Sequence, residues 1–300
     1  MSRFGMVLHG GAGNLTRSAL SAEEYNAYME ALKQALDTGY KILMAGGTAS
    51  ETVAAAVMFL EDCPLFNAGK GSVLNRNGKV EMDAAIMDGS TLAAGAVAGV
   101  SIIKNPVQLA MTLMRESPHV LLIGRQAEDY ARTMGVEIEP EAYFILPGRL
   151  EQLKGDGSIS LDHDRKFGTV GAVALDRNGD LAAATSTGGM NNKLPGRVGD
   201  SPLIGAGTYA NNQSCAVSCT GHGEFFIRHV VAHSVASRIE LLNDSLSDAA
   251  NHLIQHILSK AGGRGGLIAI DKNGHIAMPY NTPGMFHAYQ LSTGDFYVGV

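Results

Sequence analysis

The segment Gly168-Thr-Val-Gly-Ala-Val-Ala-Leu-Asp176 is followed by an Asn178-Gly179 pair and a second apolar run, Leu181-Ala-Ala-Ala-Thr-Ser-Thr187. Two apolar runs joined by Asn-Gly are the strongest short-range signal for a β-hairpin. The pattern recurs in residues 73–82 around Asn77-Gly78 and in residues 267–278 around Asn273-Gly274. Because such hairpins build antiparallel strands, a doubly wound parallel sheet is not expected.

Helical patterns flank these hairpins. Between residues 22 and 45 apolar side chains recur three and four positions apart, which predicts a long helix with one buried face. Thr48 and Glu51 form a Thr-x-x-Glu capping box that opens a second helix, and Asn105-Pro106 opens a third. A further helix pair is expected in residues 223–260. Strands with helix pairs before and after them indicate an α+β layered architecture.

Composition excludes several classes of protein. The 300 residues carry 23 Lys+Arg against 29 Asp+Glu, and this net charge of −6 argues against a surface for nucleic acid or anionic membranes. With 45% hydrophobic and 17% charged residues, the chain is typical of a globular protein. Cys63, Cys215 and Cys219 show no ligand spacing of the Cys-x-x-Cys kind. Because the sequence also lacks a leader pattern or a membrane-spanning run, we expect a cytoplasmic protein with reduced thiols.

A change of composition precedes the first hairpin. Residues 150–167 are polar, contain glycine and lack periodicity, which predicts a linker leading into a rigid strand. A threonine hydroxyl becomes a competent nucleophile when a base lies beside it, and a free α-amine on the same residue, with a pKa of about 8, supplies one. Cleavage between Gly168 and Thr169 would create that amine. The simpler interpretation of Thr169 is a β-branched residue that starts a strand.

The residues that come after Thr169 are suited to the hydrolysis of an amino-acid derivative. Thr187, at the far end of the hairpin, is expected beside Thr169. Arg197 and Asp200 lie three apart in a Gly/Pro-bounded loop. They are suited to an α-carboxylate and an α-ammonium, although a surface ion pair is the simpler interpretation. Thr220-Gly221, at a Gly-rich strand-to-helix turn, offers donors for an oxyanion or is a plain turn.

Two histidine pairs support a different hypothesis. His229 and His233, and likewise His252 and His256, lie four residues apart in predicted helices, a spacing that can hold a metal. A zinc protease would need Glu after the first His, and other residues stand there. A metal enzyme and a non-cleaving glycine-rich scaffold remain as alternatives. Chelation tests the former, and a denaturing gel tests the latter, because a scaffold runs as one band.

Seven segments, in order along nearly the whole chain, resemble the plant-type asparaginase/isoaspartyl aminopeptidase family of N-terminal-nucleophile hydrolases. The resemblance implies a four-layer αββα sandwich of antiparallel sheets in a single domain, residues 1–300. It also implies self-cleavage into an α-chain (1–168) and a β-chain (169–300), and a dimer of such αβ units. The segments are His9-Gly-Gly-Ala-Gly13, Cys63-Pro-Leu-Phe-Asn-Ala-Gly69, Met82-Asp-Ala-Ala-Ile-Met-Asp-Gly89, residues 168–176, Thr185-Ser-Thr-Gly-Gly189, Lys193-Leu-Pro-Gly-Arg-Val-Gly-Asp-Ser-Pro202 and Ser218-Cys-Thr-Gly221.

The same resemblance assigns roles to residues and implies L-asparagine and β-aspartyl dipeptides as substrates, without an organic cofactor. Thr169 is implied to be nucleophile and base, beside Thr187. Arg197 and Asp200 bind the substrate's α-carboxylate and α-amine, and the amine pocket is lined by Gly223. The oxyanion hole is formed by Thr220 and Gly221, and the α-chain contributes Asn67 near the nucleophile. A sodium ion is expected on the main-chain carbonyls of Leu60, Glu61, Cys63, Phe66, Ala68 and Lys70.

Three features depart from the family's pattern. Lys70 replaces an apolar residue, His222 replaces a small or hydroxyl residue, and the linker is short. Glycosylasparaginases, which are close relatives, place His-Asp directly before the threonine. Phe167-Gly168 stands there in this chain. This favours the asparaginase and isoaspartyl-peptide branch, with a glycosylasparaginase-like amidase as the alternative.

Overall fold

The strand that follows Thr169, β5 (Val170–Leu175), contacts two different layers of the molecule. Ala172 and Ala174 face a core that contains α-helices, whereas Val173 and Leu175 face a second sheet. This alternation follows from the two-residue period of a strand. Because both faces are covered, every residue of β5 is buried. The computed structural model that shows this arrangement describes residues 3–155 and 168–300.

Twelve strands in the described residues form two sheets. The large sheet has the order β12-β11-β1-β5-β6-β2-β3-β4, and the small sheet has the order β10-β9-β8-β7. All neighbours are antiparallel except β3 and β4, which are parallel. The strands are β1 (Gly5–Gly13), β2 (Met82–Asp88), β3 (Ala94–Val100), β4 (Leu121–Ile123), β5, β6 (Leu181–Thr187), β7 (Thr208–Ala210), β8 (Cys215–Gly221), β9 (Gly265–Asp271), β10 (Ile276–Ala277), β11 (Gly284–Leu291) and β12 (Phe296–Gly299).

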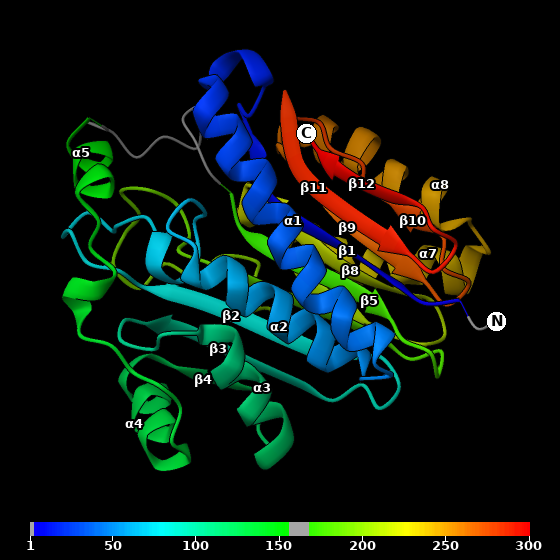
Figure 1. Cartoon of the computed structure of the whole chain (residues 1–300), viewed down its shortest axis with the longest axis horizontal. Coiled ribbons are helices and arrows are strands. Elements are labelled where there is room, and N and C mark those ends of the chain that lie inside the picture. The colour runs from blue at the N-terminus through cyan, green and yellow to red at the C-terminus, as the bar shows by residue number, and fades with distance from the viewer. Residues whose placement is uncertain (1–2, 156–167) are drawn as a thin grey trace.

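Helices cover the outer face of each sheet (Figure 1). The first three pack on the large sheet, and the C-terminal group packs on the small one. The helices are α1 (Ala22–Met44), α2 (Ala49–Asp62), α3 (Pro106–Glu116), α4 (Gly124–Met134), α5 (Pro147–Gly155), α6 (Gly223–His229), α7 (Val231–Leu242) and α8 (Leu246–Asn251), which continues as a π-helical segment over His252–Leu258; short 3-10 turns lie at Arg17–Ala19, Gly69–Gly71 and Glu141–Tyr143.

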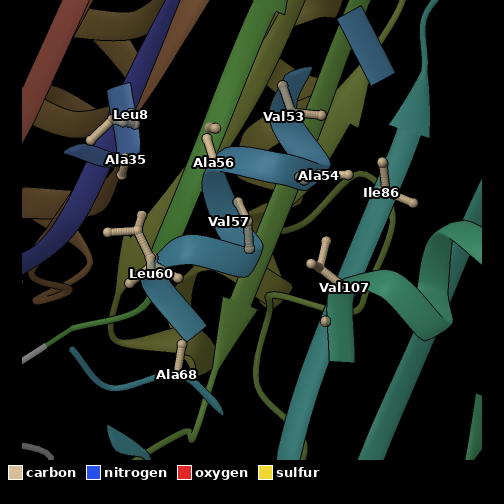
Figure 2. Close-up of a cluster of buried hydrophobic side chains, with 14 of the residues drawn as sticks. Leu8, Ala35, Val53, Ala54, Ala56, Val57, Leu60, Ala68, Ile86 and Val107 are labelled. Atoms are coloured by element: carbon tan, nitrogen blue, oxygen red, sulfur yellow. The ribbon is translucent and has the colours of Figure 1, made fainter. Parts of the chain in front are cut away.

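Three buried apolar clusters separate four layers. One lies between the helices and the large sheet, and Val53, Val57 and Leu60 of α2 belong to it (Figure 2). A second lies between the two sheets, and a third lies between the small sheet and the C-terminal helices. Cys215 and Cys219 belong to this third cluster, as small buried side chains with free thiols. The predicted α+β fold is therefore confirmed.

Local signals placed the helix starts correctly. Thr48 Oγ1 accepts from the N–H of Glu51 at 3.2 Å, and Glu51 Oε2 accepts from the N–H of Thr48 at 3.1 Å. The predicted capping box therefore forms at α2. Pro106 is the first residue of α3, also as predicted. None of the helices in residues 3–155 and 168–300 is both long and apolar enough to cross a membrane.

Of the three predicted hairpins, two form. The pair β5–β6 matches the prediction, and β9 pairs with the two-residue β10. The hairpin predicted in residues 73–82 is wrong, because Asn77-Gly78 turns without two flanking strands. Asn75 Oδ1 accepts from two backbone N–H groups within that turn, and Asn75 itself bridges to Lys193. The apolar run from Met82 onwards pairs instead with β3 and β6.

Other element boundaries also need correction. The predicted linker, residues 150–167, begins inside α5, and its remainder from 156 to 167 lies outside the described residues. The expected C-terminal helix pair is α6, α7 and α8 with its π-helical continuation. His229 and His233 do not share a helix, because Val230 adopts φ +47° between α6 and α7. Across residues 3–155 and 168–300 there is no group of three His, Cys, Asp or Glu side chains placed to bind a metal.

Candidate active site

The β5–β6 hairpin brings two threonine hydroxyls together. Its register pairs Val170 with Ser186, so Thr169 before β5 lies next to Thr187 at the end of β6. Thr169 Oγ1 donates a hydrogen bond to Thr187 Oγ1 at 3.1 Å, and both residues are buried. Thr187 Oγ1 also accepts from the N–H of Gly189 at 2.9 Å. The hydroxyl of Thr169 is thus held in one orientation.

These hydroxyls face a hollow of about 350 Å³. Most of the residues predicted for catalysis and binding line this catalytic pocket, although they come from distant parts of the chain. Ala12, Asn67 and Gly168 belong to the segment before the predicted cleavage point, and the other lining residues follow it. The lining comprises Ala12, Asn67, Gly168, Thr169, Thr187, Gly189, Met190, Arg197, Gly199, Asp200, Ser201 and Gly221.

Arg197 is fixed by an acidic side chain that the sequence analysis did not assign. Its Nε and Nη2 atoms donate to Glu224 Oε1 and Oε2, at 2.9 and 3.0 Å, in a two-pronged ion pair. The ion pair involves two of the three guanidinium nitrogens of Arg197, and Arg197 lines the pocket. A planar guanidinium held in this way is preorganised to bind a carboxylate.

Asp200 presents a buried carboxyl group. Among the described residues, its Oδ2 atom has no hydrogen-bond partner. Burial raises the pKa of Asp200 to about 7, although the charge of Arg197 opposes this shift. A Cβ atom on Gly223 would lie 2.9 Å from Asp200 Oδ1, and one on Gly207 would lie 2.8 Å from Oδ2. Two glycines therefore leave the room in which the carboxylate can receive an ammonium group.

Thr220 and Gly221 lie across from the nucleophile at the end of β8. Thr220 Oγ1 accepts from the N–H of Ala12 at 3.2 Å, which leaves its own hydrogen available to donate. A Cβ atom on Gly168 would lie 2.7 Å from Thr220 Oγ1 and 2.8 Å from the nitrogen of Ala12. In the continuous chain, Gly168 thus occupies the space beside Thr220 that a reacting carbonyl would need.

Asn67 connects the pocket to the loop after α2. Its Nδ2 donates to the carbonyl of Gly189 at 2.7 Å, and its Oδ1 accepts from the N–H of Val73 at 2.9 Å. Gly188 donates in turn to the main-chain carbonyl of Asn67 at 3.0 Å. Asn67 therefore supports the backbone that orients Thr187.

A buried lysine supports the same loop from behind. Lys193 Nζ donates to the carbonyl of Gly188 at 2.9 Å and to that of Glu81. Asp83 accepts from the N–H groups of Gly99 and Gly199 at 2.9 and 3.4 Å. Burial lowers the pKa of Lys193 and raises that of Asp83, and the attraction between the two charges opposes both shifts. Each end of the loop 188–199 is thereby fixed.

Hydroxyl groups link the two sheets beneath Thr169. His9 Nε2 lies 3.0 Å from Ser218 Oγ, which lies 2.7 Å from Thr185 Oγ1. Thr208 Oγ1 lies 2.6 Å from Thr185 Oγ1 and 2.9 Å from the carbonyl of Ser201. Burial lowers the pKa of His9 to about 3, although a hydrogen bond to the main chain of Thr169 opposes this shift. A network of neutral polar side chains therefore links the strand of Thr169 to Ser201, the residue after Asp200.

The loop predicted to bind sodium closes onto the C-terminal end of α2. The last carbonyls of a helix lack partners within it, and a Cβ on Gly69 would lie 2.3 Å from the carbonyl oxygen of Glu61. Lys70 Nζ, one of the departures noted above, lies 4.8 Å from the centre of the Tyr143 ring. The Phe66 carbonyl accepts from Arg149 Nη2 at 3.5 Å. These main-chain oxygens have the hard character that a cation such as sodium prefers.

The sequence analysis missed residues that act through the backbone or through another side chain. Ala12 contributes only a main-chain N–H, which no pattern in the sequence can indicate. Lys193, Asp83 and Glu224 are charged residues within Gly-rich or apolar segments. This unusual setting was the signal that could have marked them as functional. The attraction between Asp83 and Lys193 could not be inferred from the sequence, because the pairing of strands β2 and β6 brings these residues together.

Comparison with known proteins agrees with this geometry. The family described as Asparaginase matches residues 2–300. The chain is 50% identical over 299 residues to isoaspartyl peptidases of Salmonella typhimurium, covering 96% of each chain, and of Escherichia coli, covering 96% of this chain and 93% of that one. It is 44% identical over 273 residues to the human isoaspartyl peptidase/L-asparaginase, covering 90% and 87%. The chain therefore belongs to the asparaginase family that its sequence motifs resemble.

Proposed function

We propose that this protein is a self-processing amidohydrolase that cleaves the side-chain amide of L-asparagine and the isopeptide bond of β-aspartyl dipeptides. The observation that carries the proposal is the hydrogen bond between Thr169 and Thr187 in a pocket that also presents Arg197 and Asp200. A nucleophile, a carboxylate receptor and an ammonium receptor thus converge. The names of the relatives, which are isoaspartyl peptidases and L-asparaginases, support the same activity.

Self-processing precedes catalysis. Thr169 Oγ attacks the carbonyl carbon of Gly168, the C–N bond breaks, and the nitrogen takes the hydroxyl proton, which leaves an ester and a free α-amine. Water then hydrolyses the ester to release the carboxylate of Gly168 and to restore the hydroxyl. The departure of Gly168 clears the space beside Thr220 and Ala12.

Catalysis repeats this chemistry on a substrate. The α-amine of Thr169 takes the hydroxyl proton as Oγ attacks the β-carbonyl. Thr220 and Gly221 face the oxygen that becomes negative, and hydrogen-bond donors directed at such an oxyanion lower the barrier. The α-amine passes this proton to the leaving nitrogen, which departs as ammonia from asparagine or as the amino group of the second residue from a dipeptide. Water then hydrolyses the acyl ester on Thr169. Because Arg197 and Asp200 hold the substrate's α-carboxylate and α-ammonium, the β-carbonyl is the one that reaches Thr169.

The proposal includes a sodium ion and an assembly. A sodium ion on the carbonyls of the loop 60–70 stabilises the backbone that carries Asn67. Replacing sodium with choline in the buffer should lower the midpoint of thermal unfolding, and an unchanged midpoint would argue against the ion.

Two αβ units form the active dimer. The free thiols at Cys63, Cys215 and Cys219 fit a cytoplasmic location.

Thr169→Ala tests the proposal. The purified wild-type protein should run as two bands on a denaturing gel, and the smaller should begin Thr-Val-Gly-Ala-Val-Ala. The variant should run as one band and release neither ammonia from asparagine nor an amino acid from a β-aspartyl dipeptide. Thr169→Ser, which keeps a hydroxyl, is the matched control and should retain partial cleavage and turnover. Full activity of an uncut wild-type protein would contradict the proposal.

A further inference from the structure

A second hollow opens beside the catalytic pocket. Its volume is about 280 Å³, and it shares Ala12 and Gly221 with the pocket of Thr169. The remaining lining comes from residues that the sequence analysis did not assign, among them Asn14, Arg264 and Thr282. The two hollows therefore meet at the wall that carries the expected oxyanion donor.

The backbone of Arg264 is fixed against that wall. β8 pairs with β9 so that Gly221 lies opposite Gly265, the residue after Arg264. The carbonyl of Arg264 accepts from the N–H of His222 at 2.9 Å. A Cβ on Gly221, where φ is +151°, would lie 2.4 Å from the same carbonyl oxygen. The backbone of Arg264 is thus in direct contact with Gly221, and Arg264 is an exposed residue that lines the second hollow.

The two expected substrates differ in the group that leaves. Asparagine releases ammonia, whereas a β-aspartyl dipeptide releases an amino acid that carries its own α-carboxylate. The α-groups of the aspartyl part are directed at Arg197 and Asp200, and its carbonyl lies between Thr169 and Gly221. The leaving residue must therefore extend away from these groups, and the adjoining hollow, which is open to solvent, borders the same wall.

We propose that this second hollow is a leaving-group subsite for β-aspartyl dipeptides and that Arg264 binds the α-carboxylate of the departing residue. The inference rests on the proposed function and adds a determinant of substrate choice. The shared wall at Ala12 and Gly221 joins the subsite to the reacting carbonyl. A guanidinium is suited to this role because its planar fork matches a carboxylate.

The contribution is expected to be moderate because the Arg264 side chain is exposed. Ion pairs in contact with water are weaker than buried ones. Arg264→Ala should lower kcat/KM for a β-aspartyl dipeptide about five- to tenfold, and Arg264→Lys should restore part of the loss. The kcat/KM for asparagine should be unchanged, because ammonia has no group for Arg264 to bind.

Four proteins test the subsite: self-cleaved wild type, Arg264→Ala, Arg264→Lys and Lys272→Ala. Lys272 is the matched control, since it follows β9 whereas Arg264 precedes it, and either alanine variant removes one positive charge. Each protein is assayed with asparagine, with β-aspartyl-leucine and with the C-terminal amide of that dipeptide. Wild type should prefer the acid to the amide, and Arg264→Ala should treat the two alike.

The outcomes separate the two proposals. If wild type hydrolyses neither asparagine nor the dipeptide, the proposed function is wrong. If wild type hydrolyses both, and Arg264→Ala keeps the preference for the acid over the amide, the subsite is wrong. An equal loss on asparagine and dipeptide would likewise overturn it, because that result indicates a structural effect on Gly221. Gel analysis of self-cleavage in each variant accompanies the kinetics.

Discussion

Asp200 makes the catalytic pocket sensitive to pH. Burial raises its pKa to about 7, so protonation begins near neutral pH and removes the charge that would hold the substrate's ammonium. The α-amine of Thr169 must also be unprotonated to act as a base, and such amines have pKa values of about 8. Protonation of the Asp200 carboxylate and protonation of the Thr169 α-amine therefore each lower the activity as the pH falls.

The pH profile of kcat/KM should show both groups. We expect log(kcat/KM) to rise with pH at a slope approaching 2 below pH 7, and at a slope near 1 between about 7 and 8. Asp200→Asn should keep a slope of 1 throughout and lower kcat/KM at pH 8 by about 10- to 150-fold, as expected for a lost charge-assisted hydrogen bond. A wild-type slope of 1 down to pH 5 would contradict the role of Asp200.

At the scale of elements, the loop 188–200 is positioned by two buried side chains of opposite charge, Lys193 and Asp83, which hold its backbone and attract each other. Lys193 is 2% exposed and Asp83 is fully buried. Removing one member of such a pair leaves the other uncompensated, which typically costs about 3–5 kcal/mol. We expect Lys193→Met to lower the free energy of unfolding by about that amount, measured by urea titration in the uncut Thr169→Ala chain.

Two further variants make this measurement decisive. Lys79 is the matched control, because its side chain is 63% exposed and its contact with Glu141 is long, at 3.9 Å. Lys79→Met should change stability by less than about 0.5 kcal/mol. Adding Asp83→Asn to Lys193→Met should recover part of the loss, since the unpaired charge is then gone. If Lys193→Met is no more destabilising than Lys79→Met, the charge pair does not hold this loop.

The same scale shows what the sequence could predict. The α2 capping box, the start of α3 and the β5–β6 hairpin depend on residues close in the chain, and all three form. The hairpin expected in residues 73–82 does not form, because the run after Met82 pairs with β3 and β6. Arg197 and Asp200 could be named from the resemblance to the family, whereas their spacing alone left a surface ion pair as the simpler interpretation. The ion pair of Arg197 with Glu224 depends on tertiary contacts, which the local pattern does not contain.

At the scale of the whole molecule, strands from both sides of Gly168 alternate in one sheet. β1 precedes the cleavage point and lies between β11 and β5, which follow it. β2 also precedes it and pairs with β6. The two chains produced by cleavage therefore cannot part as separate bodies, because three strand ladders would have to break first.

This interleaving predicts how the cut protein comes apart. Size-exclusion chromatography in urea measures the separation of the 1–168 and 169–300 chains. This separation should occur at the same urea concentration as the loss of the far-ultraviolet circular dichroism signal. Coincidence of two such probes is the mark of a single cooperative transition. Uncut Thr169→Ala should show the spectroscopic transition without any separation of chains. A free 1–168 chain at urea concentrations that leave the dichroism intact would contradict the shared sheet, because β1 can leave β5 and β11 only if the layer that supports Thr169 is lost.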